Sequence, residues 1–178
     1  GGVDCSDHEV NIKILLNEVV SAGDMTAKQR DQLLFEMTDA VAELVLQNNY
    51  KQTQALSQAQ HRSRERAAEY VRLINALEAA GQLDRALEFL PSDDALTERA
   101  SIGKGLTRPE LSVLISYSKI ELKKALLDSR VPDDDYLARE MESAFPQQLS
   151  ERFHDAMLQH RLKREIVATQ IANDLVNN

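Results

Sequence analysis

The sequence predicts an all-α fold, an irregular domain of about eight helices around one central apolar helix at about residues 107–128. Three observations support this prediction. The 178 residues include only 6 Gly and 4 Pro, too few turn residues for a β-rich fold. Apolar residues recur at helical spacing, and no stretch alternates with period two for long enough to form a strand. Hydrophobic residues at 43% and charged residues at 28% are ordinary globular values.

The first half of the chain predicts three helices. The first covers residues 7–22 and ends at Gly23, because glycine accepts the left-handed conformation that often follows a helix. The second covers residues 26–47, where the helical periodicity is clearest. The polar, glutamine-rich residues 49–62 are either a loop or the exposed start of the third helix, which closes at Gly81.

The second half predicts two short helices followed by the central one. The short helices cover residues 83–89 and 93–100, on either side of Pro91. The central helix begins at Thr107, whose hydroxyl can accept a backbone N–H while Glu110 reaches back to the cap. It is apolar on several sides, which is typical of a buried helix. Three more helices complete the predicted order, over residues 132–144, 147–158 and 161–176.

Composition and charge argue against several classes of partner. The net charge of −8 is unfavourable for nucleic acid, which needs a basic face. The single cysteine, Cys5, excludes an intrachain disulfide and fits a reducing compartment. No run of about 18 apolar residues is present, and no basic-then-apolar leader opens the chain. We therefore expect a cytoplasmic protein without a membrane partner.

Motifs for catalysis, nucleotide binding and metal binding are absent from the sequence. Gly103-Lys104-Gly105 has neither the spacing of a dinucleotide fingerprint nor the Ser or Thr that ends a P-loop. His8 cannot share a metal with a histidine one turn later, because Ile12 occupies that position. We therefore predict no catalytic, cofactor-binding or metal-binding residue in this chain, and we expect its four histidines at the surface or between helices.

Charged clusters have simple structural interpretations. The acidic run at residues 133–135 has too few spaced oxygens for a calcium loop and suits a helix N-terminus. The basic clusters are expected to be solvated helix faces beside acidic neighbours, with an anion or subunit contact as the alternative. These clusters are Arg62, Arg64 and Arg66, and Arg161, Lys163 and Arg164.

The opening residues 1–9 are rich in small polar groups and lead directly into the first predicted helix. Such a loop could hold a carboxylate through its backbone N–H groups and the Ser6 hydroxyl, because a helix N-terminus favours negative charge. Alternatively, Ser6 or Asp7 simply caps the helix. Composition alone favours the cap.

Several long segments resemble the large bacterial NAD-specific glutamate dehydrogenases. The resemblance rests on GGVDCSDHEVNIKIL, GKGLTRPELSVLISYSKIEL, AFPQQLSERF and HRLKREIVATQIANDLVN, which span nearly the whole chain in the expected order. It implies that residues 1–24 are the end of the dehydrogenase domain and that residues 25–178 are a helical C-terminal domain. The catalytic lysine and aspartate of that family, and its glycine-rich nucleotide loop, are expected upstream of this chain.

The resemblance also implies a reaction and one substrate contact. The intact protein would oxidise L-glutamate to 2-oxoglutarate and ammonia, with NAD accepting the hydride. A similar Gly-Gly-Val-x-x-Ser segment of the small hexameric enzymes holds a substrate carboxylate, and the matching serine here is Ser6. Asp7-His8 departs from the aromatic pair that follows in those enzymes, so other details of the pocket are not carried over.

The resemblance leaves two roles open for this chain. In the first, it is a helical scaffold of the dehydrogenase without the catalytic centre, and only its opening residues approach the substrate. In the second, it is a regulatory or subunit-interaction module with no direct role in the active site. The implied partners are the rest of the same polypeptide, other subunits of a homo-oligomer, and L-glutamate or 2-oxoglutarate.

Overall fold

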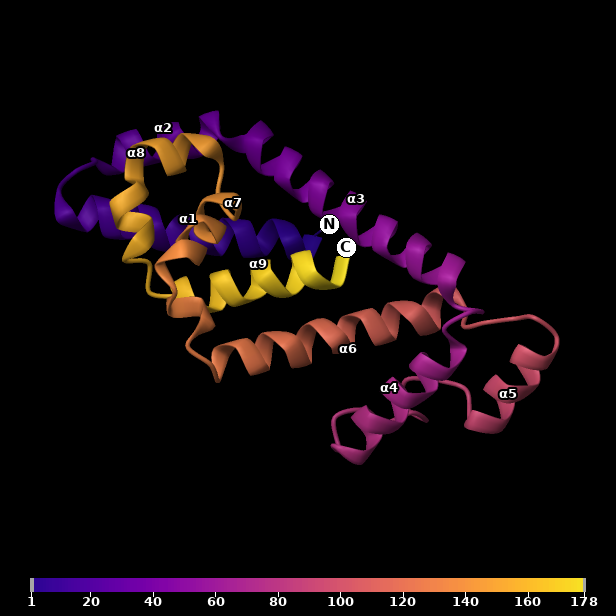
Figure 1. Cartoon of the computed structure of the whole chain (residues 1–178). Helices are drawn as coiled ribbons and strands as arrows, with labels where there is room; N and C mark the ends of the chain where they lie inside the picture. Colours follow the sequence, from indigo (N-terminus) through magenta and orange to yellow (C-terminus); the bar gives the residue numbers. More distant parts are fainter. Residues whose placement is uncertain (1, 178) are drawn as a thin grey trace. The chain divides into compact units, whose positions relative to one another are not determined.

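The structure, a computed structural model, describes residues 2–177. Within this range the chain forms nine α-helices, two short 3-10 helices and no strand, which confirms the predicted all-α class (Figure 1). None of the helices in this range is long and apolar enough to cross a membrane. In chain order the elements are α1 (Gly2–Ala22), α2 (Ala27–Glu36), α3 (Thr38–Arg62), α4 (Ala67–Ala79), α5 (Asp93–Ser101), α6 (Arg108–Leu127), η1 (Val131–Asp133), η2 (Asp135–Ala138), α7 (Arg139–Ser143), α8 (Gln147–Leu158) and α9 (Lys163–Asn177).

The helices divide into two compact units. The first unit is built from the residues up to Lys51 and from Leu122–Leu175. The second is built from Gln52–Glu121 and from the residues after Leu175. α3 and α6 each contribute residues to both units. The domain boundary predicted after residue 24 concerns a longer protein and stays a prediction.

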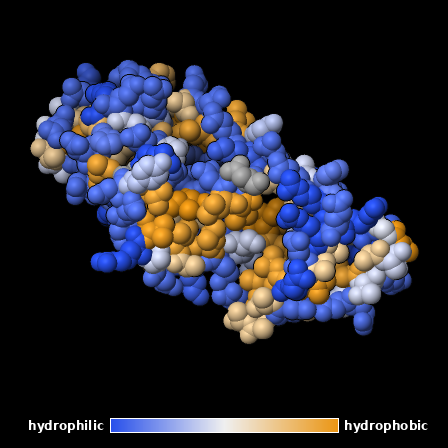
Figure 2. Space-filling model, in the orientation of Figure 1, coloured by the Kyte–Doolittle hydropathy of each residue, from blue (hydrophilic) through white to orange (hydrophobic). Residues whose placement is uncertain are grey.

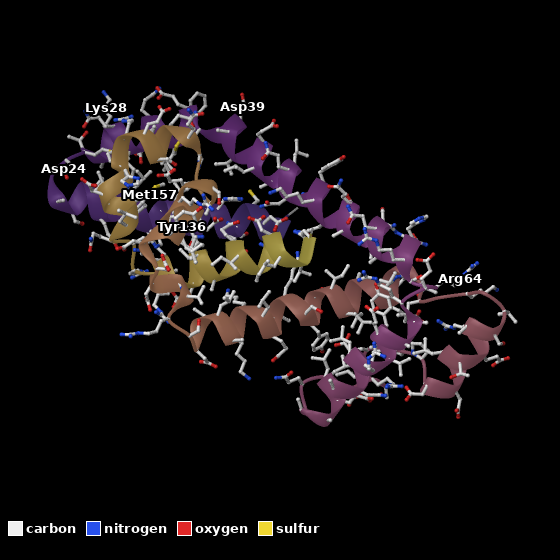
Figure 3. All side chains as sticks on the ribbon, in the orientation of Figure 1. Asp24, Lys28, Asp39, Arg64, Tyr136 and Met157 are labelled. Carbon is white, nitrogen blue, oxygen red and sulfur yellow. The ribbon has the colours of Figure 1, made fainter. Side chains whose placement is uncertain are left out.

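The core of the first unit forms where α1 packs with α2, α7, α8 and α9. Leu15 and Leu16 of α1 have no exposed surface, and each such leucine stabilises the fold by roughly 1.5–3 kcal/mol. Met157 of α8 lies between α8 and α1 (Figure 3). A smaller cluster joins α9 to the last turns of α6, where apolar side chains also gather on the surface (Figure 2). The buried members of that cluster are Leu126, Ala168 and Ala172.

The core of the second unit is made of α4, α5, the first turns of α6 and their connections. α6 contributes Leu111 and Leu114, which are 0% and 1% exposed. The connections also contribute to this core, because three of its eight buried residues lie outside any helix. The other six are Ile74, Leu77, Leu83, Leu90, Leu96 and Leu106.

The helix predicted over residues 26–47 is two helices in the structure. Thr26 begins α2 with a capping box, in which its hydroxyl accepts the Gln29 N–H at 3.2 Å and Gln29 Oε1 accepts the Thr26 N–H at 2.9 Å. The chain turns at Met37, whose side chain is buried in the core. α3 then continues to Arg62, so the glutamine-rich residues 49–62 are helical and not a loop.

The prediction of a helix over residues 83–89 is wrong, because this segment forms turns. Phe89 has φ of 54°, which a right-handed helix excludes. Leu83 and Leu90 are both buried, so the segment is held to the core at its two ends. Gly81, with φ of 67°, ends the preceding helix as predicted.

Candidate functional site

α1 presents two different faces, and the candidate site depends on this division. Successive residues of a helix turn by about 100°, so Asp4, His8 and Asn11 share one face, which we call the inner face. Ser6 lies roughly 160° away from His8, on what we call the outer face. Ser6 is exposed, whereas His8 is buried. The two faces can therefore serve different partners.

The inner face of α1 borders a polar cleft of about 230 Å³ within the first unit. Three carboxylates line it, from Asp4, Asp7 and Glu165, together with one ammonium group from Lys123. α9 supplies most of the opposite wall. The complete lining is Asp4, Asp7, His8, Asn11, Asn48, Lys123, Ala144, Leu162, Glu165, Ile166, Thr169, Gln170 and Asn173.

His8 joins α1 to two other elements at this cleft. Its Nδ1 lies 3.1 Å from the carbonyl oxygen of Ala144, and its Nε2 lies 3.4 Å from Nδ2 of Asn48. A carbonyl only accepts and an amide nitrogen only donates, so Nδ1 carries the proton and Nε2 accepts. The ring is therefore held by both of its nitrogen atoms between α1, α3 and the residue after α7.

His160 joins the same helix to the start of α9 with the opposite proton arrangement. The Leu162 N–H donates to His160 Nδ1 at 3.1 Å, so Nε2 carries the proton and donates to the Asn11 carbonyl at 3.1 Å. Phe145 meets the ring edge-on with centroids 5.8 Å apart. His8 and His160 are thus interhelical, while His61 and His154 are exposed, as the sequence predicted.

The local structure around Ser6 differs from both sequence interpretations. α1 begins at Gly2, so Ser6 lies inside the helix, neither in a loop nor at an N-cap. The reason is that residues 3–7 contain no helix breaker and extend the first turn of the amphipathic segment that follows them. On the outer face Ser6 lies near the exposed Glu9–Lys13 ion pair. A substrate contact by Ser6 stays a prediction.

No group of three metal-ligating side chains is present among residues 2–177. Asp133 of the acidic run instead pairs with Arg164, whose Nη2 also donates to the carbonyls of Leu127 at 2.9 Å and Ser129 at 3.0 Å. These contacts satisfy acceptors at the end of α6 and just after it, and the bond to Asp133 raises the pKa of Arg164 above its usual value. One member of the second basic cluster is therefore structural.

The Gly103-Lys104-Gly105 segment is also structural. A Cβ at Gly105 would lie 2.4 Å from Ser63 Oγ and 2.8 Å from the backbone N of Arg64, so this glycine permits close packing on the turn between α3 and α4. Arg64 lies at that turn (Figure 3). Gly105 thus allows the chain just before α6 to pack closely on the α3–α4 turn.

The start of α6 confirms half of the predicted capping box. Glu110 Oε2 accepts the Thr107 N–H at 2.7 Å, and Arg99 donates to both Glu110 oxygens at 2.9 Å. Burial by itself raises the pKa of Glu110, but the Thr107 bonds and the Arg99 guanidinium together lower it below its usual value. Glu110 is therefore held as a carboxylate for structural reasons.

The sequence analysis predicted neither the cleft nor the contacts of the two buried histidines. A signal for His8 was present, because His8, Ile12, Leu15 and Val19 form one continuous stripe at helical spacing. No comparable signal could reveal that residues of α1 and α9 line one cleft, since those helices are far apart in the chain.

Two family models match parts of the chain. The model described as "Bacterial NAD-glutamate dehydrogenase, catalytic domain" matches residues 1–59, and that described as "Glutamate dehydrogenase, C-terminal" matches residues 103–178. The chain is 76% identical over 178 residues to an NAD-specific glutamate dehydrogenase of Pseudomonas aeruginosa. The identity is 63% over 177 residues for the protein of the same name in Halomonas elongata, and 43% over 176 residues for that in Mycobacterium tuberculosis.

These alignments cover 100%, 99% and 99% of this chain. They cover only 11% of each relative, so the chain spans about a ninth of the length of the curated relatives it matches.

Proposed function

We propose that the chain is a segment of an NAD-specific glutamate dehydrogenase and that the intact polypeptide oxidatively deaminates L-glutamate. In this reaction glutamate, water and NAD⁺ give 2-oxoglutarate, ammonium, NADH and a proton. The nicotinamide supplies the hydride acceptor when it is bound, and the protein orients the α-carbon toward it. The identity of 76% over the whole chain is the observation that carries this proposal.

Within that enzyme, this segment acts as a helical scaffold that does not contain the catalytic centre. Residues 1–24 are the end of the dehydrogenase domain, and residues 25–178 are a helical C-terminal domain. The contacts of the polar groups support this role, because His8, His160 and Glu110 all engage in bonds between elements of the fold. NAD is bound elsewhere in the polypeptide.

Ser6 is the one residue of this segment that contacts the substrate, through its carboxylate. Two observations support this assignment. Ser6 lies on the exposed outer face of α1, and its hydroxyl has no hydrogen-bond partner among residues 2–177. The inner face, in contrast, is occupied by contacts to α3, α7 and α9. A ligand held by the rest of the polypeptide can therefore reach Ser6 without disturbing the core.

The test is Ser6→Ala in the intact enzyme. Loss of one hydrogen bond to a charged carboxylate should lower kcat/KM for glutamate by roughly 10- to 100-fold. Thermal stability should stay the same or rise slightly, because Ser6 is exposed in a helix and alanine has the higher helix propensity.

The matched control is Ser112→Ala, which removes an exposed serine hydroxyl from α6. It should leave kcat/KM for glutamate and NAD unchanged. An unchanged kcat/KM for Ser6→Ala would remove Ser6 from the site, while glutamate oxidation by the parent enzyme would still support the reaction itself.

Exposed apolar side chains favour a second candidate role, as a module that contacts other subunits. Phe35 of α2 and Leu46 of α3 are 78% and 65% exposed, which is costly for a surface that meets only water. In this role the enzyme is a cytoplasmic homo-oligomer, and Phe35→Ser with Leu46→Ser shifts its sedimentation toward smaller species. A sedimentation coefficient equal to that of the parent enzyme would exclude these residues from subunit contacts.

A further inference from the structure

The connection between α4 and α5 (Figure 1) carries two exposed apolar side chains, Leu87 and Phe89. Leu87 is 72% exposed, and Phe89, at 90%, is more exposed than any other large apolar side chain among the described residues. We call this pair the knob. Such exposure of a phenylalanine next to buried Leu83 and Leu90 indicates a surface that another partner covers.

The backbone beneath the knob is rigid. Asp84 Oδ1 accepts the N–H groups of Ala86 at 3.0 Å and Leu87 at 2.9 Å, and the Leu90 N–H donates to the Arg85 carbonyl at 2.9 Å. Glu88, between the two knob residues, accepts a hydrogen bond from the Tyr117 hydroxyl of α6 at 2.7 Å. These bonds hold both sides of the turn.

Arg85 fixes the segment to its neighbours on both sides. Its guanidinium pairs with Glu78 of α4 at 2.9 Å and with Asp93 of α5 at 2.7 Å, and it donates to the Pro91 carbonyl at 3.2 Å. The side chain is only 15% exposed. Hydrogen bonds to charged groups are the stronger ones, so this anchor keeps the turn in a single conformation.

The backbone at the knob is also strained. Phe89 has φ of 54°, a left-handed conformation that a bulky side chain rarely adopts. Glycine or asparagine would adopt it more easily. A strained residue that is rigidly held and fully exposed is typical of a functional contact.

We propose that the knob docks into an apolar pocket on another part of the same polypeptide. Two arguments favour a pocket on the same polypeptide: the small area that the knob can bury, and its covalent connection to the rest of the chain. Two side chains bury at most roughly 400 Å², well below the 800 Å² or so per partner of a stable association between free proteins. A covalently connected partner needs less area, because its effective concentration reaches about the millimolar range. About 89% of the relatives' length lies outside the matched segment, so such a partner is available.

This inference rests on the proposed function only in taking the chain as one segment of a longer enzyme. The test places the photoreactive amino acid p-benzoylphenylalanine at position 89 of the full-length polypeptide. Irradiation should link position 89 to peptides of the same chain that lie outside these 178 residues. The yield should exceed, by at least about fivefold, that from the same probe at Glu98, an exposed polar position of α5.

Each outcome is decisive. Intrachain links to a peptide outside the segment support the proposal, and the linked peptide identifies the pocket. Links that double the molecular mass would instead make a second copy the occupant and overturn it. No link above the Glu98 level would mean that the knob stays in water, which also overturns it. None of these readouts requires glutamate turnover, so failure here is distinguishable from failure of the proposed function.

Discussion

Two buried imidazoles attach α1 to its surroundings through opposite tautomers. His8 donates from Nδ1, whereas His160 donates from Nε2, because each ring faces one carbonyl and one N–H donor. Each ring therefore uses both of its nitrogen atoms in contacts between elements of the fold.

His160→Ala should lower the free energy of unfolding by about 2–3 kcal/mol. The substitution removes a ring that is 3% exposed and leaves the Leu162 N–H and the Asn11 carbonyl without their partner. Urea unfolding followed by circular dichroism measures the change. His154→Ala, which removes an exposed side chain whose Nδ1 lies 3.1 Å from Glu142, is the matched control and should change stability by less than about 0.5 kcal/mol.

Glu110→Gln should destabilise the fold in a way that depends on pH. The folded protein lowers the pKa of Glu110 below the unfolded value of 4.5, so the carboxylate stabilises the fold fully above pH 4.5. That contribution is lost as pH falls through the folded pKa. We expect a difference of about 1–2 kcal/mol from the parent protein at pH 7, shrinking steadily below pH 4.5.

Urea titrations of both proteins between neutral and acidic pH measure this difference. Glu98→Gln, on the exposed side of α5, serves as the control for a general effect of charge. A gap between the parent and Glu110→Gln that stays constant with pH would contradict the ionic role of Glu110.

At the scale of elements, Gly105 approaches the α3–α4 turn so closely that position 105 has no room for a side chain. Gly105→Ala should destabilise the second unit by about 2–3 kcal/mol, because the new Cβ meets backbone atoms of Ser63 and Arg64 at 2.8 Å. Thermal unfolding measures the loss. Gly2→Ala is the control, since its Cβ would have nothing within 4 Å, and it should be neutral or slightly stabilising. Equal melting temperatures for both variants would show that the turn can shift without cost.

The sequence predicted elements well where local chemistry determines them. Gly81 and the Thr107–Glu110 cap mark their helix ends through contacts that span only a few residues. The segment 83–89 was predicted wrongly for the opposite reason. Its turn depends on Arg85 reaching Glu78 and Asp93, and on Tyr117 holding Glu88, and periodicity does not report such contacts.

At the scale of the whole molecule, the candidate site was predictable only in part. Ser6 could be named from its motif, but the helical start of α1 places it inside the helix and on the exposed face. The cleft could not be named, because it joins residues 4–11 with residues 165–173. Side chains this far apart along the chain come together only in the tertiary fold, and no local sequence pattern reports that they do.

The 178-residue chain by itself should not reduce NAD with glutamate. The proposal places the groups that perform the hydride transfer in the rest of the polypeptide, and His8, His160 and Glu110 of this chain are engaged in bonds within the fold. An assay that follows NADH absorbance, with the full-length enzyme as the positive control, tests this directly. Turnover by the purified chain above a blank without protein would mean that a catalytic centre is present within it.

The division of α1 into two faces has a consequence for how its sequence can vary. Substitutions scanned along the helix should separate into two phenotypes that alternate every three to four residues. Changes at positions such as His8, Ile12 and Leu15 should appear as lower protein abundance in cells, whatever the assay. Changes around Ser6 should leave abundance normal and alter only growth that depends on glutamate as the carbon source. Two separate selective pressures would then act on one helix, at positions that alternate with the helical period.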